Sequence, residues 1–379
     1  SYGPGRYDSD YEYKGLTYPL GYVRWTETRN IGSFLDLLAL GNVKVDQLIS
    51  AEYSIDQAML AYEEATSDDA EVIGVVLTYP EHQQTNNADK TWRLPSVIDA
   101  RDDRVKLMLV GPGHFAKAVH LPNLKTLSKK VFVQAVVGGS GGSARQAAEK
   151  IGAPIVSTDI SDVILKEDLD AVLISTRHNL HRQQCIAAAE AGKHIFVEKP
   201  LGLTVDECIE VLQAVEKAQV LCTIGFNRRF SSLSMSLRES ISSVTGPKQI
   251  IYRVNAGRLP QGHWLLDPEI GGGRLIGEGC HFFDFMSWML NADASSVTAQ
   301  STGDSSDDVS VVVKYNDGSV GTLIYTALGS IGFSKERIEI YAGGGVGVID
   351  DFLSLSLHHL PGKSRKLRVA DKGHLALLD

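Results

Sequence analysis

Residues 105–226 alternate short apolar segments with segments of helical spacing, and this alternation constrains the fold more than any other feature of the chain. The apolar segments lie at 105–111, 131–138, 154–158, 171–176, 194–200 and 220–226. Strands that are apolar throughout and alternate with helices belong to parallel sheets covered on both faces. The pattern therefore predicts an α/β Rossmann domain with a doubly wound parallel sheet of six strands.

The chain changes character after Phe226. The segments KQIIYRVNAG, VSVVVKYNDGSVGTLIYTAL and ERIEIYAGGGVGVID alternate apolar and polar residues, which is typical of strands with one buried face. The NDG between two of these runs predicts a hairpin. We therefore expect an α+β domain with a large, mostly antiparallel sheet after the Rossmann domain.

These patterns divide the chain into four predicted parts. Residues 1–84 form a separate block with two helical segments and one apolar strand, and residues 85–103 form a linker. The Rossmann domain covers residues 104–227. The antiparallel domain covers residues 228–379, and we expect that it is truncated.

Composition and charge limit the partners of the chain. The formal net charge is -9, which argues against a nucleic-acid partner because such proteins carry a basic face. We expect no signal peptide and no membrane segment, since no apolar run approaches the roughly 20 residues of a spanning helix. Scattered cysteines predict free thiols in a reducing, cytoplasmic compartment and no metal site. They are Cys185, Cys208, Cys222 and Cys280.

The sequence VGPGHFA places the pattern G-x-G-x-x-A at Gly111, Gly113 and Ala116, directly after the first predicted strand. In this context Gly111 permits a tight turn, Gly113 lets the backbone approach a pyrophosphate, and Ala116 lets the helix pack closely. The helix that starts with His114 and Phe115 supplies unpaired N–H groups for phosphate. These five residues are the predicted core of a dinucleotide site, and the alternative is an ordinary glycine-rich turn.

The choice between NAD and NADP stays open. The second strand of an NAD site normally ends in an acidic residue that binds the ribose, whereas this one ends in Gly138 and Gly139. Ser140 and Arg145 follow and can meet the 2′-phosphate of NADP. The alternative is a flexible glycine loop with a solvated arginine.

The segment FVEKPLG places Lys199 at the carboxyl end of the fifth predicted strand. Ligands of open α/β sheets bind outside the carboxyl ends of the strands, so we expect this lysine beside the nicotinamide. Its ammonium group can hydrogen-bond a substrate oxygen and stabilise negative charge that develops there. The alternative is a structural ion pair with Glu198.

A second catalytic candidate lies in GGGRLIGEGCHFFDFMSWML, where a glycine turn leads into an amphipathic helix. Glu278, His281 and Asp284 follow one another at intervals of three residues, so neighbours lie on adjacent helical turns. A histidine exchanges a proton near neutral pH, and a carboxylate such as Glu278 can orient it. The alternative is a histidine on the helix surface.

Five motifs in order resemble the glucose–fructose oxidoreductase / inositol dehydrogenase / MocA family (GFO/IDH/MocA). They are the glycine turn, STRHNLH, AGKHIFVEKPLG, GFNRRF and GGGRLIGEGCHFFD. The resemblance implies a nicotinamide cofactor, a sugar, sugar-nucleotide or cyclitol substrate, and an open-faced sheet that often forms an oligomer interface. It assigns the motif lysine to Lys199 and the motif histidine to His281. Many members carry an aspartate four residues before that histidine, where this chain has Gly277.

Further site residues are predicted in the same motifs. Arg228 and Asp284 are predicted to bind the substrate. An ordinary surface role is the alternative for Arg228, as it is for Asn179 and His181. Several residues that follow strand ends are predicted to contact the cofactor: Thr176, Asn179, His181, Glu198 and Lys199.

The first block has a resemblance of its own. SYGPGRYD, YPLGYVRWTETRN, FLDLLALGNVKVDQLIS and SIDQAMLAYE are similar to the C-terminal tail of a medium-chain, zinc-type alcohol dehydrogenase. The resemblance implies that the chain is a fragment of a larger fusion of two enzymes.

Together these features predict a cytoplasmic NAD(P)-dependent oxidoreductase that transfers hydride to or from a secondary alcohol of a sugar-like substrate. A homo-oligomer through the antiparallel sheet is also expected. Two alternatives stay open, namely NAD-dependent glycosidase-like chemistry and a nucleotide-binding scaffold without turnover.

Overall fold

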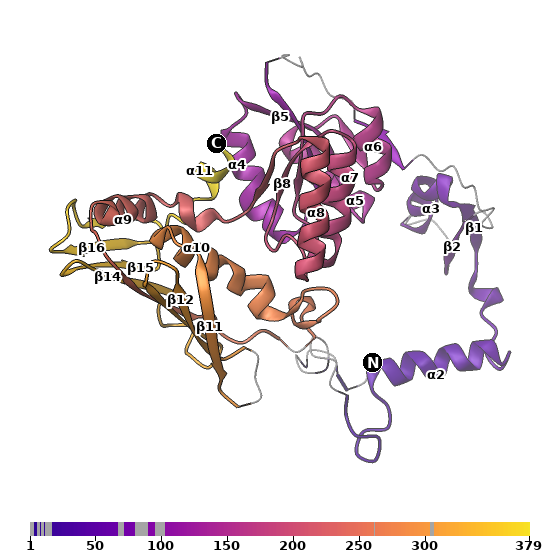
Figure 1. The fold of residues 1–379 in the computed structure, drawn as a ribbon. Coiled ribbons are helices and arrows are strands. Elements are labelled where there is room, and N and C mark those ends of the chain that lie inside the picture. Colours follow the sequence, from indigo (N-terminus) through magenta and orange to yellow (C-terminus); the bar gives the residue numbers. More distant parts are fainter. Residues whose placement is uncertain are drawn as a thin grey trace. The chain divides into compact units, whose positions relative to one another are not determined.

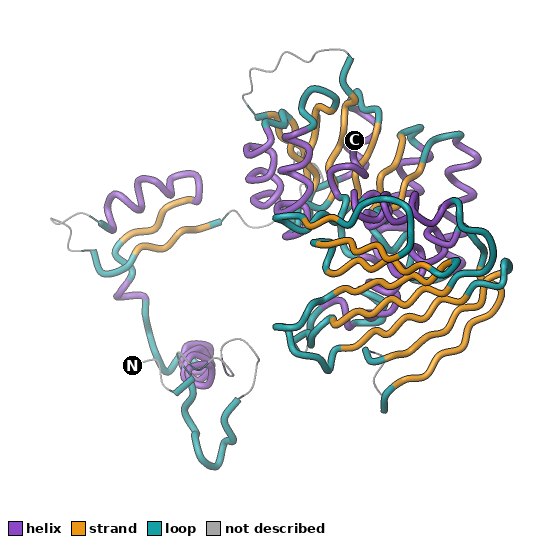
Figure 2. Tube along the Cα trace, turned by 90° about the vertical axis from the view of Figure 1, so that its left-hand side faces the viewer, coloured by secondary structure: helices purple, strands orange, loops and turns teal. Residues whose placement is uncertain are grey.

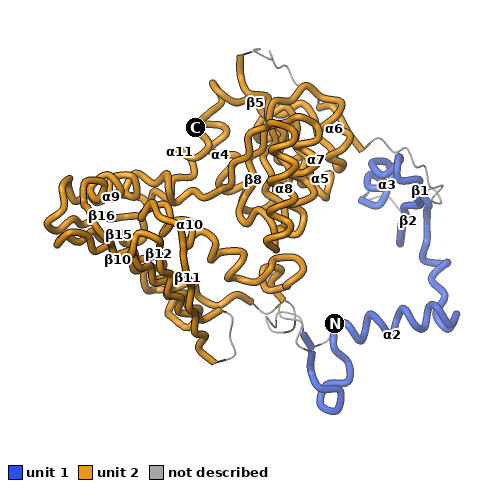
Figure 3. Tube along the Cα trace, in the orientation of Figure 1, with its two compact units in different colours: residues 1–88 blue, residues 89–379 orange. Residues whose placement is uncertain are grey.

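The structure is a computed structural model that describes residues 4–5, 8, 11, 17–66, 72–79, 90–94, 103–260, 262–303 and 307–379. It falls into two compact units, residues 1–88 and residues 89–379, which Figure 3 shows in different colours. Unit 1 corresponds to the predicted first block. Unit 2 contains both of the predicted larger domains.

Unit 1 contains a small parallel sheet and two α-helices among its described residues. The first helix, α2 (Glu27–Ala39), begins at the N-cap Thr26, whose side chain accepts a hydrogen bond from the backbone N–H of Arg29. This helix buries none of its residues. The other elements are η1 (Asp46–Leu48), β1 (Ala51–Ser54), η2 (Ile55–Gln57), α3 (Ala58–Ala65) and β2 (Val75–Thr78), with β1 and β2 paired in parallel. Such a two-stranded sheet is marginally stable by itself.

The Rossmann sheet opens unit 2 (Figure 1). Its strands lie in the order β3-β6-β5-β4-β7-β8-β9, and every neighbouring pair except β3 and β6 is parallel. The strands are β3 (Thr91–Arg93), β4 (Val105–Val110), β5 (Val131–Val137), β6 (Ile155–Ser157), β7 (Ala171–Ile174), β8 (His194–Val197) and β9 (Cys222–Ile224). All six predicted strands are present, and the predicted doubly wound sheet is confirmed.

Helices cover both faces of this sheet because its strands are apolar on both faces. One core packs the sheet against α4 (Leu121–Thr126) and α5 (Gly141–Ile151). The core on the other face packs it against α6 (Ile160–Lys166), α7 (His181–Glu190) and α8 (Val205–Ala218). The carboxyl ends of the strands are left for the connecting turns.

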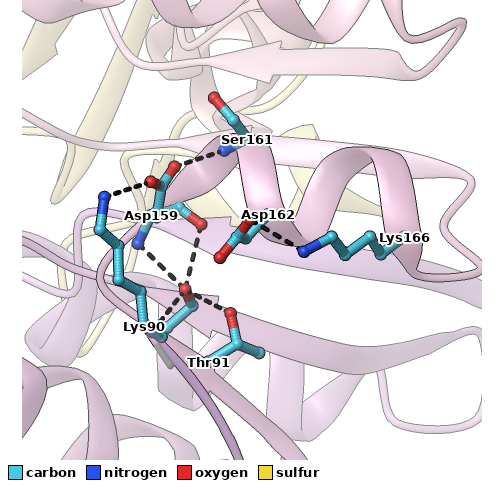
Figure 4. A network of polar contacts seen from close by, with 7 residues as sticks. Lys90, Thr91, Asp159, Ser161, Asp162 and Lys166 are labelled. Carbon is cyan, nitrogen blue, oxygen red and sulfur yellow. Dashed lines mark hydrogen bonds and ion pairs between the residues drawn. The ribbon is translucent and has the colours of Figure 1, made fainter. Parts of the chain in front are cut away.

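Strand β3 lies within the predicted linker, which is therefore wrong for these residues. Trp92 pairs with Val156 in antiparallel register. A polar network fixes this added edge strand (Figure 4): the ammonium group of Lys90 lies 2.9 Å from Asp159, and the hydroxyl of Thr91 donates to Ser157 at 2.9 Å. A three-residue strand without alternation gives no sequence signal of its own, and the rest of the predicted linker lies almost entirely outside the described residues.

The second half of unit 2 is an eight-stranded sheet, whose strands run side by side in Figure 2. Its order is β11-β12-β13-β10-β14-β15-β16-β17, with only the β10–β13 pair parallel. The strands are β10 (Gln249–Asn255), β11 (Ala294–Ser301), β12 (Val309–Tyr315), β13 (Val320–Thr326), β14 (Glu336–Ala342), β15 (Gly345–Asp350), β16 (Ser354–His358) and β17 (Arg365–Lys366). The mostly antiparallel sheet and the predicted hairpin between β12 and β13 are confirmed.

Helix α10 (Cys280–Leu290) covers one face of this sheet and links it to the site. Its side chains Phe282, Phe285, Met286 and Met289 are buried in one core with the inward residues of the strands. The helix therefore has a fixed position, and its first turn carries His281. Shorter elements complete the unit: η3 (Ala116–His120), η4 (His178–Leu180), η5 (Asn227–Phe230), α9 (Ser232–Ser242), η6 (Trp264–Leu266), η7 (Leu275–Gly279) and α11 (His374–Leu378).

Candidate active site

The glycine turn after β4 has the geometry that close approach of a ligand requires. Gly111 adopts φ +84°, and a Cβ there would lie 2.6 Å from the side chain of Thr176. At Gly113 a Cβ would meet only the carbonyl oxygen of Gly111 at 4.0 Å, so this side of the turn is open. Ala116 is fully buried at the start of η3. The turn therefore has room for a pyrophosphate where a larger residue would fill the space.

Lys199 lies just beyond the end of β8. The position of this strand end is fixed because Phe196 and Val197 pack into the cores on the two faces of the sheet. Its ammonium group donates a hydrogen bond of 2.6 Å to the carbonyl oxygen of Gly277. The bond connects the Rossmann sheet to η7, the turn before α10. An ammonium group has three donors, so others remain for a substrate oxygen.

His281 is 7% exposed and lies in the first turn of α10. Burial lowers the pKa of its imidazole well below the usual range, and the cationic Arg228 and Lys199 lower it further. The imidazole is therefore neutral near pH 7. Its Nδ1 atom is buried and has no hydrogen-bond partner among the described residues.

One cavity of about 230 Å³ brings the three predicted catalytic side chains together. Lys199, His281 and Glu278 all line it, although Lys199 comes from the Rossmann half and the other two from the second half of unit 2. The remaining lining residues are Phe115, Glu198, Asn227, Arg228, Phe282, Lys335, Lys372 and His374. The arrangement places a cation and a neutral imidazole in one cavity, which suits the polarisation and proton exchange of a hydroxyl group.

The carboxylate of Glu278 is hydrogen-bonded and ion-paired with residues other than His281. Its carboxylate accepts a hydrogen bond from the hydroxyl of Tyr325 and lies 3.2 Å from the guanidinium of Arg274. Burial opposes its ionisation, yet Lys335, Tyr325 and Arg274 together keep its pKa below the usual value. Glu278 is thus an ionised group of the cavity wall.

The position of the family aspartate is closed to a side chain. A Cβ at Gly277 would lie 2.5 Å from Leu265 and 2.9 Å from the ring of His178. That ring cannot easily move, because its Nδ1 lies 2.8 Å from the carbonyl oxygen of Gly271. The backbone carbonyl of Gly277 instead takes the hydrogen bond from Lys199.

The two predicted substrate residues have partners within the protein. Arg228 is buried and forms two hydrogen bonds with Glu336, of 2.7 and 2.9 Å. Asp284 pairs with Arg229 and does not line the cavity. Pairing over 108 residues, as between Arg228 and Glu336, leaves no local pattern in the sequence.

The predicted cofactor residues after β7 separate into two kinds. His181 is fully buried, and its ring nitrogens lie 2.7 Å from the carbonyl oxygen of Pro200 and 3.3 Å from that of Thr176. It therefore ties the two strand-end loops together and does not face the cavity. Asn179 is exposed, and the hydroxyl of Thr176 donates to Gln184 at 2.6 Å.

The turn after β5 carries the residues predicted to choose between NAD and NADP. Ser140 is the N-cap residue of α5 and makes no side-chain cap bond. Arg145 lies on the exposed surface of the same helix, 2.8 Å from Glu149. This pair is exposed, so it is weak enough for a phosphate to displace.

Sequence reasoning missed five cavity residues: Asn227, Phe282, Lys335, Lys372 and His374. Lys372 donates to the buried carboxylate of Glu336 at 2.7 Å. His374 approaches Phe115, with 5.8 Å between the ring centroids. Both follow the last strand of the sheet, where the sequence DKGH offers no periodic signal.

A glycine turn open to a pyrophosphate, beside a cavity with a lysine and a neutral histidine, defines a nicotinamide-dependent oxidoreductase. Residues 105–226 match the oxidoreductase family with an NAD-binding Rossmann fold, GFO/IDH/MocA, and residues 247–346 match the C-terminal domain of the same family. The two matches together span more than half of the chain, which therefore belongs to the GFO/IDH/MocA oxidoreductases.

Relatives by sequence include several named sugar and cyclitol enzymes. The chain is 28% identical over 250 residues to myo-inositol 2-dehydrogenase of Thermotoga maritima, which covers 64% of this chain and 74% of the relative. It is 30% identical over 199 residues to scyllo-inositol 2-dehydrogenase (NAD(+)) of Bacillus subtilis, with 52% and 57% covered. It is 29% identical over 195 residues to 1,5-anhydro-D-fructose reductase of Ensifer adhaerens, with 50% and 58% covered. The chain thus spans less than two thirds of the second and third relatives.

Solved structures share the fold at lower identity. Levoglucosan dehydrogenase, in complex with NADH and L-sorbose, superposes with a TM-score of 0.63 at 22% identity, covering 72% of this chain and 83% of the other. The WlbA dehydrogenase of Bordetella pertussis, in complex with NADH and UDP-GlcNAcA, gives 0.60 at 20% identity, with 66% and 77% covered. None of the helices that the structure describes is long and apolar enough to cross a membrane.

Proposed function

We propose that this chain transfers hydride between a nicotinamide cofactor and a secondary alcohol of a sugar, sugar-nucleotide or cyclitol substrate. The observation that carries the proposal is the convergence of Lys199 and His281 on one cavity from opposite halves of unit 2. The names of the relatives support the substrate class, since they include two inositol dehydrogenases and an anhydrofructose reductase.

The residues of the chain divide the work. The turn from Gly111 to Ala116 would bind the pyrophosphate of the cofactor, which supplies the hydride acceptor or donor at its nicotinamide ring. Lys199 would donate a hydrogen bond to the reacting oxygen and stabilise its negative charge. His281, which is neutral, would accept the proton of the alcohol during oxidation and return it during reduction.

The supporting residues keep these groups in place. Gly277 positions Lys199 through its carbonyl oxygen. Arg228 lines the cavity while paired with Glu336, so we assign it a positioning role beside substrate contact. Glu278 adds an ionised carboxylate that can accept hydrogen bonds from substrate hydroxyls.

The test compares Lys199→Met with Lys217→Met, a control at an exposed position on α8. We expect Lys199→Met to slow hydride transfer by roughly 100-fold or more on a panel of polyols and inositols. NADH affinity should change little, because the pyrophosphate binds elsewhere. Turnover that survives in Lys199→Met would contradict the proposed role, and wild-type chain that binds NADH without turnover would indicate a binding module.

The sheet supports a further proposal, a homo-oligomer through its outer face. Residues of β11 are exposed along its whole length, and Val312, Ile324 and Tyr341 place apolar side chains on the outer face of the sheet. Exposed apolar groups on neighbouring strands are typical of an interface. Light scattering would measure the mass, and a Val312→Lys variant should shift it toward the monomer.

Unit 1 fits the resemblance to the tail of an alcohol dehydrogenase, and we propose that it completes another Rossmann-like sheet. The parallel pair β1–β2 supports this, because parallel sheets are normally larger and covered on both faces. The helix α2 exposes the apolar side chains of Ile31, Phe34 and Leu35, which such a larger sheet could cover.

We also propose a cytoplasmic location for the protein, because all four of its cysteines are free thiols.

A further inference from the structure

The C-terminal segment returns to the site and is fixed there by hydrogen bonds. The carboxylate of Asp371 accepts from the backbone N–H of Ser232 and from that of Gly373, each at 2.9 Å. The side-chain amide of Asn227 donates to the carbonyl oxygen of Lys372 at 2.7 Å. These bonds fix the backbone from Asp371 to Gly373 and therefore the position of His374, which follows directly.

Gly373 lets the backbone of the C-terminal segment pack directly against the backbone of η5. It adopts φ +79°, and a Cβ there would lie 2.4 Å from the carbonyl oxygen of Asn227 and 2.4 Å from the backbone nitrogen of Ser231. Only glycine fits such a position without displacing η5. The segment is therefore built against η5, which itself lines the cavity through Asn227 and Arg228.

Beyond His374 the chain is anchored to the Rossmann half. Leu378 packs against the hydrophobic core that α4 and α5 form with the sheet. The carboxylate of Asp379 lies 2.6 Å from the ammonium group of Lys130. With contacts on both sides, α11 holds its first residue at the boundary of the two halves.

His374 faces the glycine-turn side of the cavity. Its ring lies 5.8 Å from that of Phe115, the residue that directly precedes Ala116 of the dinucleotide turn. Glu198, at the end of β8, acts electrostatically on the His374 imidazole, as does His120 of η3. His374 is thus surrounded by the elements that would receive the nicotinamide end of a dinucleotide.

The chemistry of His374 matches a carboxamide. Burial lowers the pKa of its imidazole to about 4, so near pH 7 it is neutral, with one N–H donor and one acceptor nitrogen. A carboxamide offers the complementary pair, an N–H₂ donor and a carbonyl acceptor.

We propose that His374 is a cofactor-binding residue that hydrogen-bonds the carboxamide of the nicotinamide. The proposal rests on the proposed function, in that it needs a nicotinamide cofactor. It adds a contact from the far C-terminal segment to a site whose other predicted cofactor residues come from the Rossmann half.

The test compares two ligands by calorimetric titration, NADH and ADP-ribose, which lacks the nicotinamide. We expect His374→Ala to weaken NADH binding about five- to tenfold, as for the loss of one hydrogen bond. ADP-ribose affinity should stay within about twofold. His374→Gln retains a donor and an acceptor and should give an intermediate NADH affinity, while His358→Ala, at an exposed residue of β16, should leave both affinities unchanged.

Three results would overturn the inference. Equal weakening of both ligands in His374→Ala would show a structural role for the segment, and unchanged NADH affinity would show no contact. A raised KM for the substrate with unchanged NADH affinity would assign His374 to the substrate. Absence of NADH binding by the wild-type chain would overturn the proposed function itself.

Discussion

Replacing Glu336 should destabilise unit 2 more than replacing a carboxylate of an exposed ion pair. Its side chain is fully buried and accepts four hydrogen bonds: two from Arg228, at 2.7 and 2.9 Å, and one each from Tyr252 and Lys372, both at 2.7 Å. Burial opposes its ionisation, but the cations of Arg228 and Lys372 hold its pKa well below the ordinary value. The carboxylate is therefore the counter-ion of a buried arginine.

In Glu336→Gln the charge of Arg228 stays buried without a counter-ion. Loss of one partner of a buried ion pair costs about 3–5 kcal/mol, and we expect the free energy of unfolding in urea at pH 7 to fall by about 3 kcal/mol or more. The matched control is Glu339→Gln, since Glu339 pairs at 2.7 Å with Arg337, whose side chain is 40% exposed. That change should cost about 1 kcal/mol or less.

The pH dependence provides a second check on Glu336. Because its pKa is lowered on folding, its carboxylate stabilises the fold above the ordinary pKa of 4.5, and this stabilisation is lost as pH falls below that value. The difference in the free energy of unfolding between wild type and Glu336→Gln should therefore become smaller below pH 4.5. Equal effects of Glu336→Gln and Glu339→Gln at pH 7, or a difference that does not narrow in acid, would refute the reasoning.

Four further predictions concern the site. Gly113→Val should fill the open side of the turn and strongly raise the dissociation constant of NADH in calorimetry. Arg145→Ala should weaken NADP binding more than NAD binding, because the arginine is predicted to meet the 2′-phosphate. Burial lowers the pKa of His178 to about 4 from 6.5, so this group should contribute about 3 kcal/mol of stability above pH 6.5 that is lost between pH 6.5 and 4; His178→Gln should flatten that part of the urea stability profile. Gly277→Asp should lower both stability and turnover, measured in urea and by NADH absorbance, because its Cβ would collide with Leu265.

Each of these predictions has an outcome that contradicts it. Unchanged NADH affinity in Gly113→Val would exclude this turn as the pyrophosphate site. A large preference for NAD that persists in Arg145→Ala would exclude the phosphate role. A stability profile that is the same in His178→Gln and wild type would place the acid sensitivity elsewhere, and full activity of Gly277→Asp would show that the pocket around this residue adapts.

Periodicity was sufficient for the six parallel strands and for the hairpin of unit 2, because each of these strands obeys its own local pattern. The six apolar segments between Val105 and Phe226 became the parallel strands, and NDG became the hairpin between β12 and β13. Strand β3 was missed, since it is three residues long and is held by pairing with β6 and by side chains such as Lys90.

The candidate site was accessible to sequence reasoning only where a motif sits at a strand or helix end. Lys199 and His281 have that property, and the structure places both at one cavity. His181 has it too, yet its ring faces backbone carbonyls inside the protein. Partnerships between distant segments, such as Arg228 with Glu336 or His374 with Phe115, depend on how the two halves pack and have no local signal.

Gly277 connects the sequence departure to the chemistry of the site. An aspartate there would add negative charge near His281 and favour its protonated form. In this chain Lys199 bonds a neutral carbonyl instead, and the nearby cations Arg228 and Lys199 together with burial keep the imidazole neutral. The imidazole therefore stays in its unprotonated form to lower pH, although a lower pKa also makes it a weaker base, so we expect the pH at which oxidation falls off to be lower than in members that carry the aspartate. The same closed pocket at Gly277, lined by Leu265 and His178, leaves no room for a carboxylate at this position, and the carboxylates that line the cavity with His281 are those of Glu198 and Glu278.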